Sequence, residues 1–216
     1  MSTPAEVTAE QALGAARALL DEALRTGSRR LLGIAGAPGA GKSTLTALLA
    51  DHLPERSCVV VPMDGFHLAD AALARLGRLE RKGAPDTFDA AGYVALLQRL
   101  RTARPRDPSV WAPTFERDLE QPLAGAIEVP AEVPLVITEG NYLLADGAFA
   151  PVRALLDARW FVETTVELRR QWLVERHERF GKSPEQARRW ALGPDEDNAR
   201  LVAATRARAQ LVVSTS

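Results

Sequence analysis

Eight consecutive residues form a pattern that is typical of phosphate-binding loops. They are Gly36, Ala37, Pro38, Gly39, Ala40, Gly41, Lys42 and Ser43. They match G-x-x-x-x-G-K-[ST] at every fixed position, with an apolar run before them and a helical pattern after them. Glycines let the backbone curl so that successive N–H groups point toward phosphate oxygens, and the positive end of the next helix adds to the attraction. The pattern predicts a nucleotide-binding loop that extends to Thr44, rather than a glycine-rich turn without a ligand.

Two side chains of this loop have predicted roles of their own. Lys42 is expected to reach the β- and γ-phosphates of ATP, and Ser43 to offer its hydroxyl to Mg²⁺. An acid at the end of a neighbouring buried strand faces the metal in P-loop proteins. Glu139 follows the apolar run at 133–138 and is the candidate for that position. The alternative is a solvated glutamate where a strand leaves the core, and the nearby P-loop favours the metal role.

A second carboxylate follows another apolar run. Asp64 comes after the segment at 57–63 and precedes Gly65. In a parallel sheet the carboxyl ends of the strands meet at the ligand crevice, so Asp64 could accept a hydroxyl proton as that hydroxyl attacks phosphate. Asp64 could equally form an ordinary Asp-Gly turn. His67 is close enough in sequence to line the same pocket, or to be a partly buried structural histidine.

A basic segment lies further along the chain. Five cationic residues occur within 169–182, namely Arg169, Arg170, Arg176, Arg179 and Lys182. Most of these charges are expected to form ion pairs with Glu175 and Glu178 on a solvated helix. Phosphoryl transfer spreads negative charge over equatorial oxygens, which a mobile helix carrying arginine can neutralise. We therefore expect one or two of these arginines to act from a helical lid over residues 165–193.

Apolar runs alternate with helical patterns along the chain. Buried strands are predicted at 31–35, 57–63, 133–138, 158–163 and 209–214. Helices are predicted at 43–53, 89–102, 165–180 and 184–193. This alternation implies crossover connections and a parallel sheet with helices on both faces. The expected fold is therefore a three-layer α/β fold with a central parallel sheet.

Two segments lie outside this alternation. Residues 1–28 are predicted to contain an amphipathic N-terminal helix, with Thr3 as its N-cap, Pro4 in its first turn and Glu6 completing a capping box. Residues 103–131 are rich in proline and weakly patterned. They are predicted to form a loop or small hairpin over the edge of the sheet rather than a second domain.

Composition narrows the class of protein. The 216 residues suit one domain over 1–216, and the net charge of −1 gives no reason to expect nucleic acid or an anionic membrane as a partner. A single cysteine, Cys58, excludes an internal disulfide and a multi-cysteine metal site. No apolar run approaches the roughly 20 residues of a membrane span, and the N-terminus lacks the pattern of a secretion signal. We expect a cytoplasmic protein that acts on a small molecule.

Taken together, the motifs resemble the superfamily of phosphoribulokinases, uridine kinases and type I pantothenate kinases, over roughly residues 29–214. The segments RKGAPDTFD (81–89), MDGFH (63–67) and TRARAQL (205–211) are similar to blocks of the pantothenate kinases. The resemblance implies that Asp64 is the catalytic base. It also implies that Arg176, four residues after Trp172, is the lid arginine. Phosphoribulokinases carry a histidine three residues after the base, which makes His67 an expected substrate ligand.

The resemblance has informative departures. Pantothenate kinases carry Tyr-x-His where this chain has Phe115 and Arg117, and a tyrosine where it has Leu173. Asp195 and Asn198 compete for the position of a family asparagine. A site without its hydrogen-bonding groups loses its intended substrate by large factors, which argues against pantothenate. The segments GKSPEQA and EGNYLL resemble instead a bacterial branch of nucleoside- or nucleotide-kinase-like proteins, some of which are labelled sugar or fructose-transport kinases.

The sequence therefore predicts a kinase that transfers the γ-phosphate of ATP, with Mg²⁺, to a hydroxyl of a nucleoside, sugar or related alcohol. His67, Arg117 and Asn198 are expected to orient the acceptor. The rival is a nucleotide-dependent switch or regulatory P-loop NTPase. A GTPase would need Asn-Lys-x-Asp, and neither asparagine, Asn141 nor Asn198, is followed by lysine. The acceptor and the oligomeric state are not encoded in any recognisable pattern.

Overall fold

A six-stranded parallel sheet forms the centre of the protein in the computed structural model, which describes residues 3–215. Its strand order is β1-β8-β7-β2-β6-β3. The strands are β1 Ala5–Val7, β2 Arg30–Gly36, β3 Cys58–Pro62, β6 Leu135–Gly140, β7 Ala158–Glu163 and β8 Leu211–Ser214. Every neighbouring pair is parallel, so the chain must cross over the sheet between strands.

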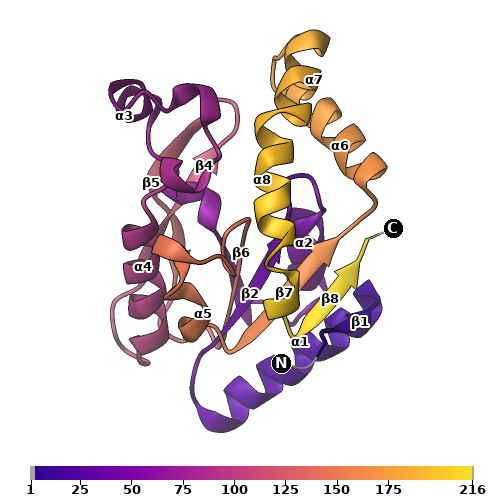
Figure 1. Ribbon diagram of the computed structural model, residues 1–216. Coiled ribbons are helices and arrows are strands. Elements are labelled where there is room, and N and C mark those ends of the chain that lie inside the picture. The colour runs from indigo at the N-terminus through magenta and orange to yellow at the C-terminus, as the bar shows by residue number, and fades with distance from the viewer. Residues whose placement is uncertain (1–2, 216) are drawn as a thin grey trace.

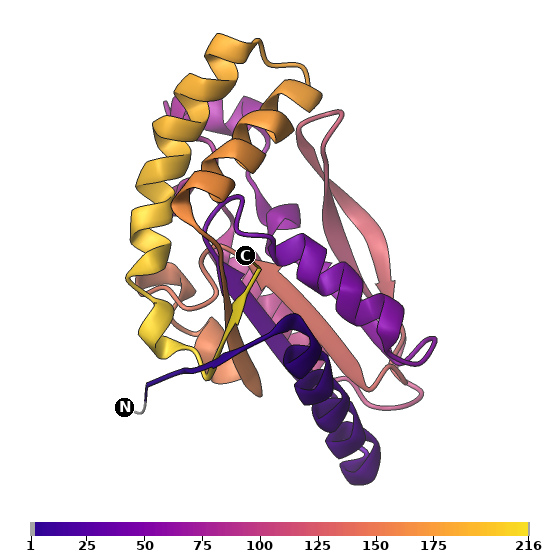
Figure 2. The same ribbon diagram turned by 90° about the vertical axis from the view of Figure 1, so that its right-hand side faces the viewer.

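Helices cover both faces of the sheet (Figures 1 and 2). One face packs against α1 (Ala9–Thr26) and α2 (Lys42–His52). The other face packs against α4 (Ala90–Thr102), α5 (Val152–Leu155) and α8 (Pro194–Ala203). Alternate residues of β2 point to opposite faces, since Leu31 lies in one hydrophobic cluster and Leu32 in the other. This arrangement confirms the predicted three-layer α/β fold.

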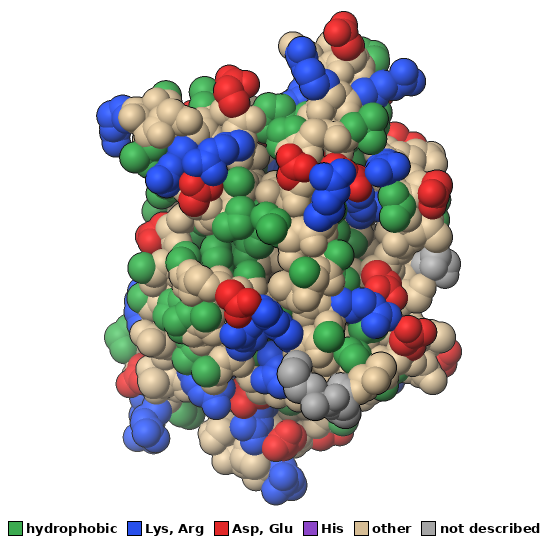
Figure 3. All heavy atoms as spheres, viewed as in Figure 1, with side chains coloured by type: hydrophobic (Ala, Val, Ile, Leu, Met, Phe, Trp, Pro, Cys, Tyr) green, Lys and Arg blue, Asp and Glu red, His purple; other side chains and the backbone are tan. Residues whose placement is uncertain are grey.

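The remaining elements reach beyond the carboxyl ends of the strands. On one side lie α3 (Asp70–Arg75) and an antiparallel hairpin of β4 (Val110–Glu116) and β5 (Gln121–Val129). On the other side lie α6 (Val166–Arg179) and α7 (Pro184–Leu192) (Figure 1). The surface is hollowed between the two groups (Figure 3). The predicted hairpin within 103–131 is thus present, and it forms one wall of this hollow.

The N-terminal prediction was wrong in one respect. The helix begins at Ala9, and its N-cap is Thr8, whose side chain forms a capping box with Gln11. The segment with the predicted cap, Thr3 to Glu6, instead leads into strand β1, which pairs with β8. Two capping-box patterns follow one another in this sequence, and pairing with the edge of the sheet decides between them.

The surface carries basic and acidic side chains interspersed, as one face shows (Figure 3). This mixture is consistent with the net charge of −1. Among the helices within residues 3–215, none has the length and apolar character needed to cross a bilayer.

Candidate active site

The predicted phosphate-binding loop joins the end of β2 to the start of α2, with Gly39 and Gly41 at φ +76° and +92°. Helix α6 packs directly on this loop. A Cβ added to Gly39 would lie 2.6 Å from Leu173 Cγ and 2.9 Å from the backbone oxygen of Arg169. Glycine is therefore required both for the left-handed backbone and for the close approach of the helix.

Replacing Gly39 by alanine is expected to destabilise the protein and to weaken ATP binding. The left-handed backbone costs about 1–2 kcal/mol for alanine, and the overlap with α6 adds to this cost. We expect a melting temperature lower by roughly 4–8 °C. Gly14→Ala is the matched control, because Gly14 lies within α1 with nothing within 4 Å of its added Cβ; it should raise the melting temperature slightly. Equal melting temperatures for the two variants would contradict the prediction.

Lys42 lies across the mouth of the loop. Its Nζ donates to the backbone oxygens of Gly36 at 3.0 Å and Ala37 at 3.1 Å, and to Asn141 Oδ1 at 2.8 Å. These three acceptors match the three N–H groups of an ammonium ion. Burial lowers the pKa of Lys42, while Glu139 and Asp64 act in the opposite direction. A positive charge thus sits where a curled glycine backbone can receive phosphate.

The carboxyl end of β6 brings an acid to this loop. Parallel pairing of β2 with β6 sets Ile34 opposite Glu139, and Ser43 Oγ donates to Glu139 Oε1 at 2.8 Å. Glu139 is buried, and this burial raises its pKa, although Lys42 and the Ser43 hydroxyl favour the charged form. A hydroxyl and a carboxylate side by side are oxygen donors of the kind that Mg²⁺ prefers.

Asp64 follows β3, in a short 3-10 turn over Met63–Phe66. Pairing of β3 with β6 sets Pro62 opposite Glu139, so Asp64 emerges at the same edge of the sheet. A Cβ on Gly65 would overlap the carbonyl of Pro113 in the hairpin. The Asp-Gly sequence thus serves the close packing of the hairpin on this turn, in addition to forming the turn itself.

Charged neighbours lower the pKa of the Asp64 carboxyl. Burial alone would raise its pKa, but His67 when protonated, and then Arg117, Lys42 and Arg176, lower it below its ordinary value. Arg117 Nη2 lies 3.1 Å from Asp64 Oδ2. Asp64 is therefore a carboxylate at neutral pH, and the Arg117 guanidinium is its ion-pair partner.

His67 lies beside Asp64 with a defined tautomer. Its Nδ1 is 2.8 Å from the backbone oxygen of Asp64, and a carbonyl can only accept, so Nδ1 carries the proton. The ring lies between Phe88 and Phe115, with centroids 4.0 and 4.7 Å away. Burial lowers the pKa of His67, so the ring is neutral at neutral pH and its Nε2 is left as an acceptor.

The predicted lid residues face the same space from above. Arg176 lines the cleft from α6, and within residues 3–215 its guanidinium makes no hydrogen bond or ion pair. Three contacts tie α6 to α8: Arg169 and Arg170 both pair with Glu196, and His177 Nε2 lies 2.7 Å from Asp195 Oδ2. Asp195 and Asn198 are both buried and both line the cleft, and of the two only Asp195 has a charged or ionisable partner in the described part of the chain, namely His177.

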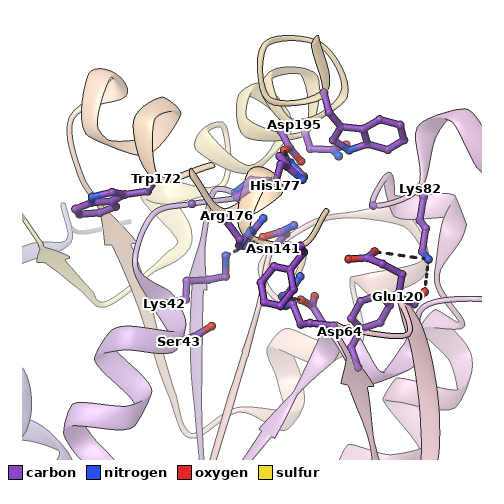
Figure 4. A pocket seen from close by; sticks show the side chains of 18 of the residues that line it. Lys42, Ser43, Asp64, Lys82, Glu120, Asn141, Trp172, Arg176, His177 and Asp195 are labelled. Carbon is purple, nitrogen blue, oxygen red and sulfur yellow. Dashed lines mark hydrogen bonds and ion pairs between the residues drawn. The ribbon is translucent and has the colours of Figure 1, made fainter. Parts of the chain in front are cut away.

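A single cleft of about 1060 Å³ brings these groups together (Figure 4). Its lining includes the predicted residues Gly39, Ala40, Gly41, Lys42, Ser43, Thr44, Asp64, His67, Arg117, Glu139, Arg176 and Asn198. Pro38 lines it as well, while Gly36 and Ala37 contribute the backbone oxygens that hold Lys42. Loop, both acids, lid arginine and three polar side chains from distant segments thus share one space.

Sequence reasoning missed several residues of the cleft. Asn141 holds Lys42, and Thr215 Oγ1 donates to the backbone oxygen of Ala40. Lys82 lines the cleft beside Phe115, with Nζ 5.2 Å from the ring centroid. Asn141 was within reach of prediction, because it comes two residues after the predicted metal ligand at the end of a strand.

Comparisons with known proteins identify the family of the chain. The profile of the "Phosphoribulokinase / Uridine kinase family" matches residues 31–214. The chain belongs to this family. Its relatives include "Putative uridine kinase C227.14" of Schizosaccharomyces pombe, 33% identical over 72% of this chain and 69% of that protein. "Uncharacterized protein YggC" of Escherichia coli is 33% identical over 86% of this chain and 77% of its own length.

A solved structure supports the same assignment. It is described as a "putative fructose transport system kinase" from Silicibacter sp. TM1040, is 38% identical, and superposes with a TM-score of 0.81 over 93% of this chain and 98% of that one. The family resemblance predicted from the motifs is confirmed. As a member of the phosphoribulokinase/uridine kinase family, the chain is a P-loop kinase that uses ATP and acts on a small molecule.

Proposed function

We propose that the chain transfers the γ-phosphate of ATP, together with Mg²⁺, to a hydroxyl group of a nucleoside, a sugar or a related alcohol. The observation that carries this proposal is the meeting of Lys42, Asp64 and Glu139 in one cleft above the phosphate loop. A regulatory nucleotide switch would not need a carboxylate such as Asp64, which lines the cleft on the side of the hairpin. We further propose that residues 1–216 act as one kinase domain with residues 165–193 as its lid.

Each residue has a proposed task. The loop amides and Lys42 bind the phosphates, and Arg176 closes from the lid over the charge that develops during transfer. Ser43 and Glu139 would hold Mg²⁺, which supplies charge neutralisation on the phosphates when bound. Within residues 3–215 no group of three His, Cys, Asp or Glu side chains is arranged for a metal. This fits Mg²⁺, which usually uses one or two carboxylates together with substrate phosphates.

The acceptor is activated by proton removal. Asp64 takes the proton from the acceptor hydroxyl while the hydroxyl oxygen forms a bond to the γ-phosphorus of ATP. The bond between that phosphorus and the leaving oxygen of ADP breaks. His67 Nε2 accepts a hydrogen bond from the acceptor, and Asn198 contacts it from α8. Because the pKa of Asp64 is lowered, the base stays ionised throughout the neutral range.

A screen coupled to ADP release tests the proposal directly. Nucleosides, pentoses, hexoses, sugar phosphates and pantothenate are offered with MgATP, and at least one class should give ADP release well above that with ATP alone. Pantothenate should be a poor acceptor, because Phe115, Arg117 and Leu173 replace the polar groups its kinases use. Binding of ATP without acceptor-dependent ADP release from any class would instead favour a regulatory role.

A further inference from the structure

The carboxylate proposed as the base is already engaged in this structure. Asp64 Oδ2 is bound by Arg117 Nη2 at 3.1 Å, and the Asp64 side chain is only 25% exposed. An oxygen bound to a guanidinium is a weaker proton acceptor than a free one, because the cation stabilises the charged carboxylate. For Asp64 to work as a base on a hydroxyl, Arg117 must find another partner when the acceptor binds.

Arg117 is placed to exchange partners. It lies in the turn between β4 and β5, its side chain is 36% exposed, and it lines the cleft. Within residues 3–215, Asp64 is its only ion-pair partner. Its other contact is with the Phe115 ring, whose centroid lies 5.5 Å from the guanidinium carbon. A ring contact can persist while the guanidinium turns away from Asp64, so exchange requires only a local movement.

The other cations around the cleft are either paired within the protein or assigned to the phosphates of ATP. Lys82 Nζ lies 2.6 Å from Asp70 Oδ1 and 4.0 Å from Glu120 Oε2, so its charge is neutralised within the protein. Figure 4 shows Lys82 beside Glu120. Lys42 is held by the phosphate loop, and Arg176 faces that loop from the lid. Among the described cations around the base, Arg117 is thus the one whose only ion-pair partner is Asp64, the carboxylate that the reaction needs.

We propose that the acceptor is a hydroxylated anion, and that its carboxylate or phosphate group takes Arg117 from Asp64. The proposal rests on the proposed function and narrows its substrate class. The guanidinium exchanges one anionic partner for another, and the freed Asp64 oxygen then faces the acceptor hydroxyl. Arginine suits this task because its planar fork binds both carboxylate and phosphate through two parallel hydrogen bonds. A neutral nucleoside or sugar offers Arg117 no such exchange and leaves the base engaged.

Matched acceptor pairs test the charge requirement. Glycerate is compared with glycerol, gluconate with glucose, ribose 5-phosphate with ribose, and fructose 6-phosphate with fructose, and uridine serves as a neutral nucleoside. We expect the best acceptor to be an anion whose kcat/KM exceeds that of its neutral counterpart by about 100-fold or more, since a neutral acceptor forms no charge-assisted hydrogen bonds with Arg117 and leaves Asp64 in its ion pair. The carboxylate and phosphate pairs distinguish the two sources of the anion. A neutral compound as the best acceptor would overturn the proposal.

Substitution of Arg117 tests the residue itself. Arg117→Gln should raise KM for the anionic acceptor by about 100-fold, whereas kcat/KM for its neutral counterpart should rise rather than fall, because Asp64 is no longer held in an ion pair with Arg117. The affinity for ATP should stay within a few-fold. Arg117→Lys keeps the charge but not the planar fork, and its KM for the anionic acceptor should lie between those of the parent protein and Arg117→Gln. Arg99→Gln is the matched control, because Arg99 is exposed on α4, away from the cleft. An unchanged KM for the anion in Arg117→Gln would overturn the assignment.

Calorimetric titration separates this proposal from the proposed function. The same compounds are titrated into the protein loaded with a non-hydrolysable ATP analogue. Binding of an anion that is lost in Arg117→Gln supports the proposal even where no phosphate is transferred, in which case only the kinase function fails. Turnover of neutral compounds with no anion preference refutes the proposal and leaves the kinase function intact. Absence of Arg117-dependent binding by every anion refutes it as well.

Discussion

The variant Lys42→Ala should lose phosphoryl transfer, with kcat lower by at least about 1000-fold. The Nζ of Lys42 is the charge held at the mouth of the phosphate loop by Gly36, Ala37 and Asn141. Alanine removes that charge. Arg176 cannot take its place, because it reaches the cleft from α6, on the opposite side. The neighbouring acids Glu139 and Asp64 would then face the phosphates without a compensating ammonium ion.

Steady-state kinetics, ATP titration and thermal melting on the same preparation check this expectation. Stability must be measured because the substitution leaves Asn141 and two backbone oxygens without their donor, which costs free energy of its own. Arg99→Ala, on an exposed position of α4, controls for loss of a cation elsewhere. Full turnover in Lys42→Ala would end the interpretation of this loop as the site of phosphoryl transfer.

The variant Asp64→Asn should lower kcat by about 10²–10⁴-fold, the usual contribution of a general base. Affinity for ATP should stay within a few-fold, because the nucleotide is held mainly by the loop amides, Lys42 and Mg²⁺. Asparagine preserves the size of the side chain and an oxygen that can accept from Arg117. It lacks the charge and the basicity that proton removal requires.

The competing interpretation of Asp64 as a turn residue predicts another outcome. Asparagine is well tolerated in turns, so activity would persist with at most a small change in melting temperature. The chain offers a matched control in Asp146, which also precedes a glycine but is exposed and pairs with Arg153 and Arg208 outside the cleft. Asp146→Asn should leave kcat unchanged. Near-normal kcat in Asp64→Asn as well would remove Asp64 from the mechanism.

The parts of the site that could be predicted from sequence depend on local pattern and on one geometric rule. The loop motif is contiguous, and the acids Asp64 and Glu139 each follow a buried strand. Since parallel strands end at a common edge, their meeting near Lys42 was predictable without coordinates. The structure places all three in one cleft. The same reasoning predicted five of the sheet's strands, because each is a continuous apolar run.

The remaining features depend on contacts between distant segments. The pair of Arg117 with Asp64 requires the hairpin to fold over the edge of the sheet, and its proline-rich sequence carries little periodicity. The sequence left open the choice between Asp195 and Asn198, and the pairing of Asp195 with His177 depends on the packing of α6 on α8. Strand β1 has only three residues, too few for a period to be visible. Its existence depends on a partner about two hundred residues away.

Because β8 pairs with β1, the sheet can be completed only late in synthesis. Within residues 3–215, strand β1 pairs with β8 alone, and Thr215 just beyond β8 contacts the phosphate loop at Ala40. Contacts between such distant residues form late, because a long loop must first be closed. Strand β1 leaves the ribosome before the other strands of this sheet and is therefore among the last of them to be placed. A nascent chain that already contains the whole phosphate loop therefore still lacks the contact of Thr215 with that loop until residues 211–215 have emerged.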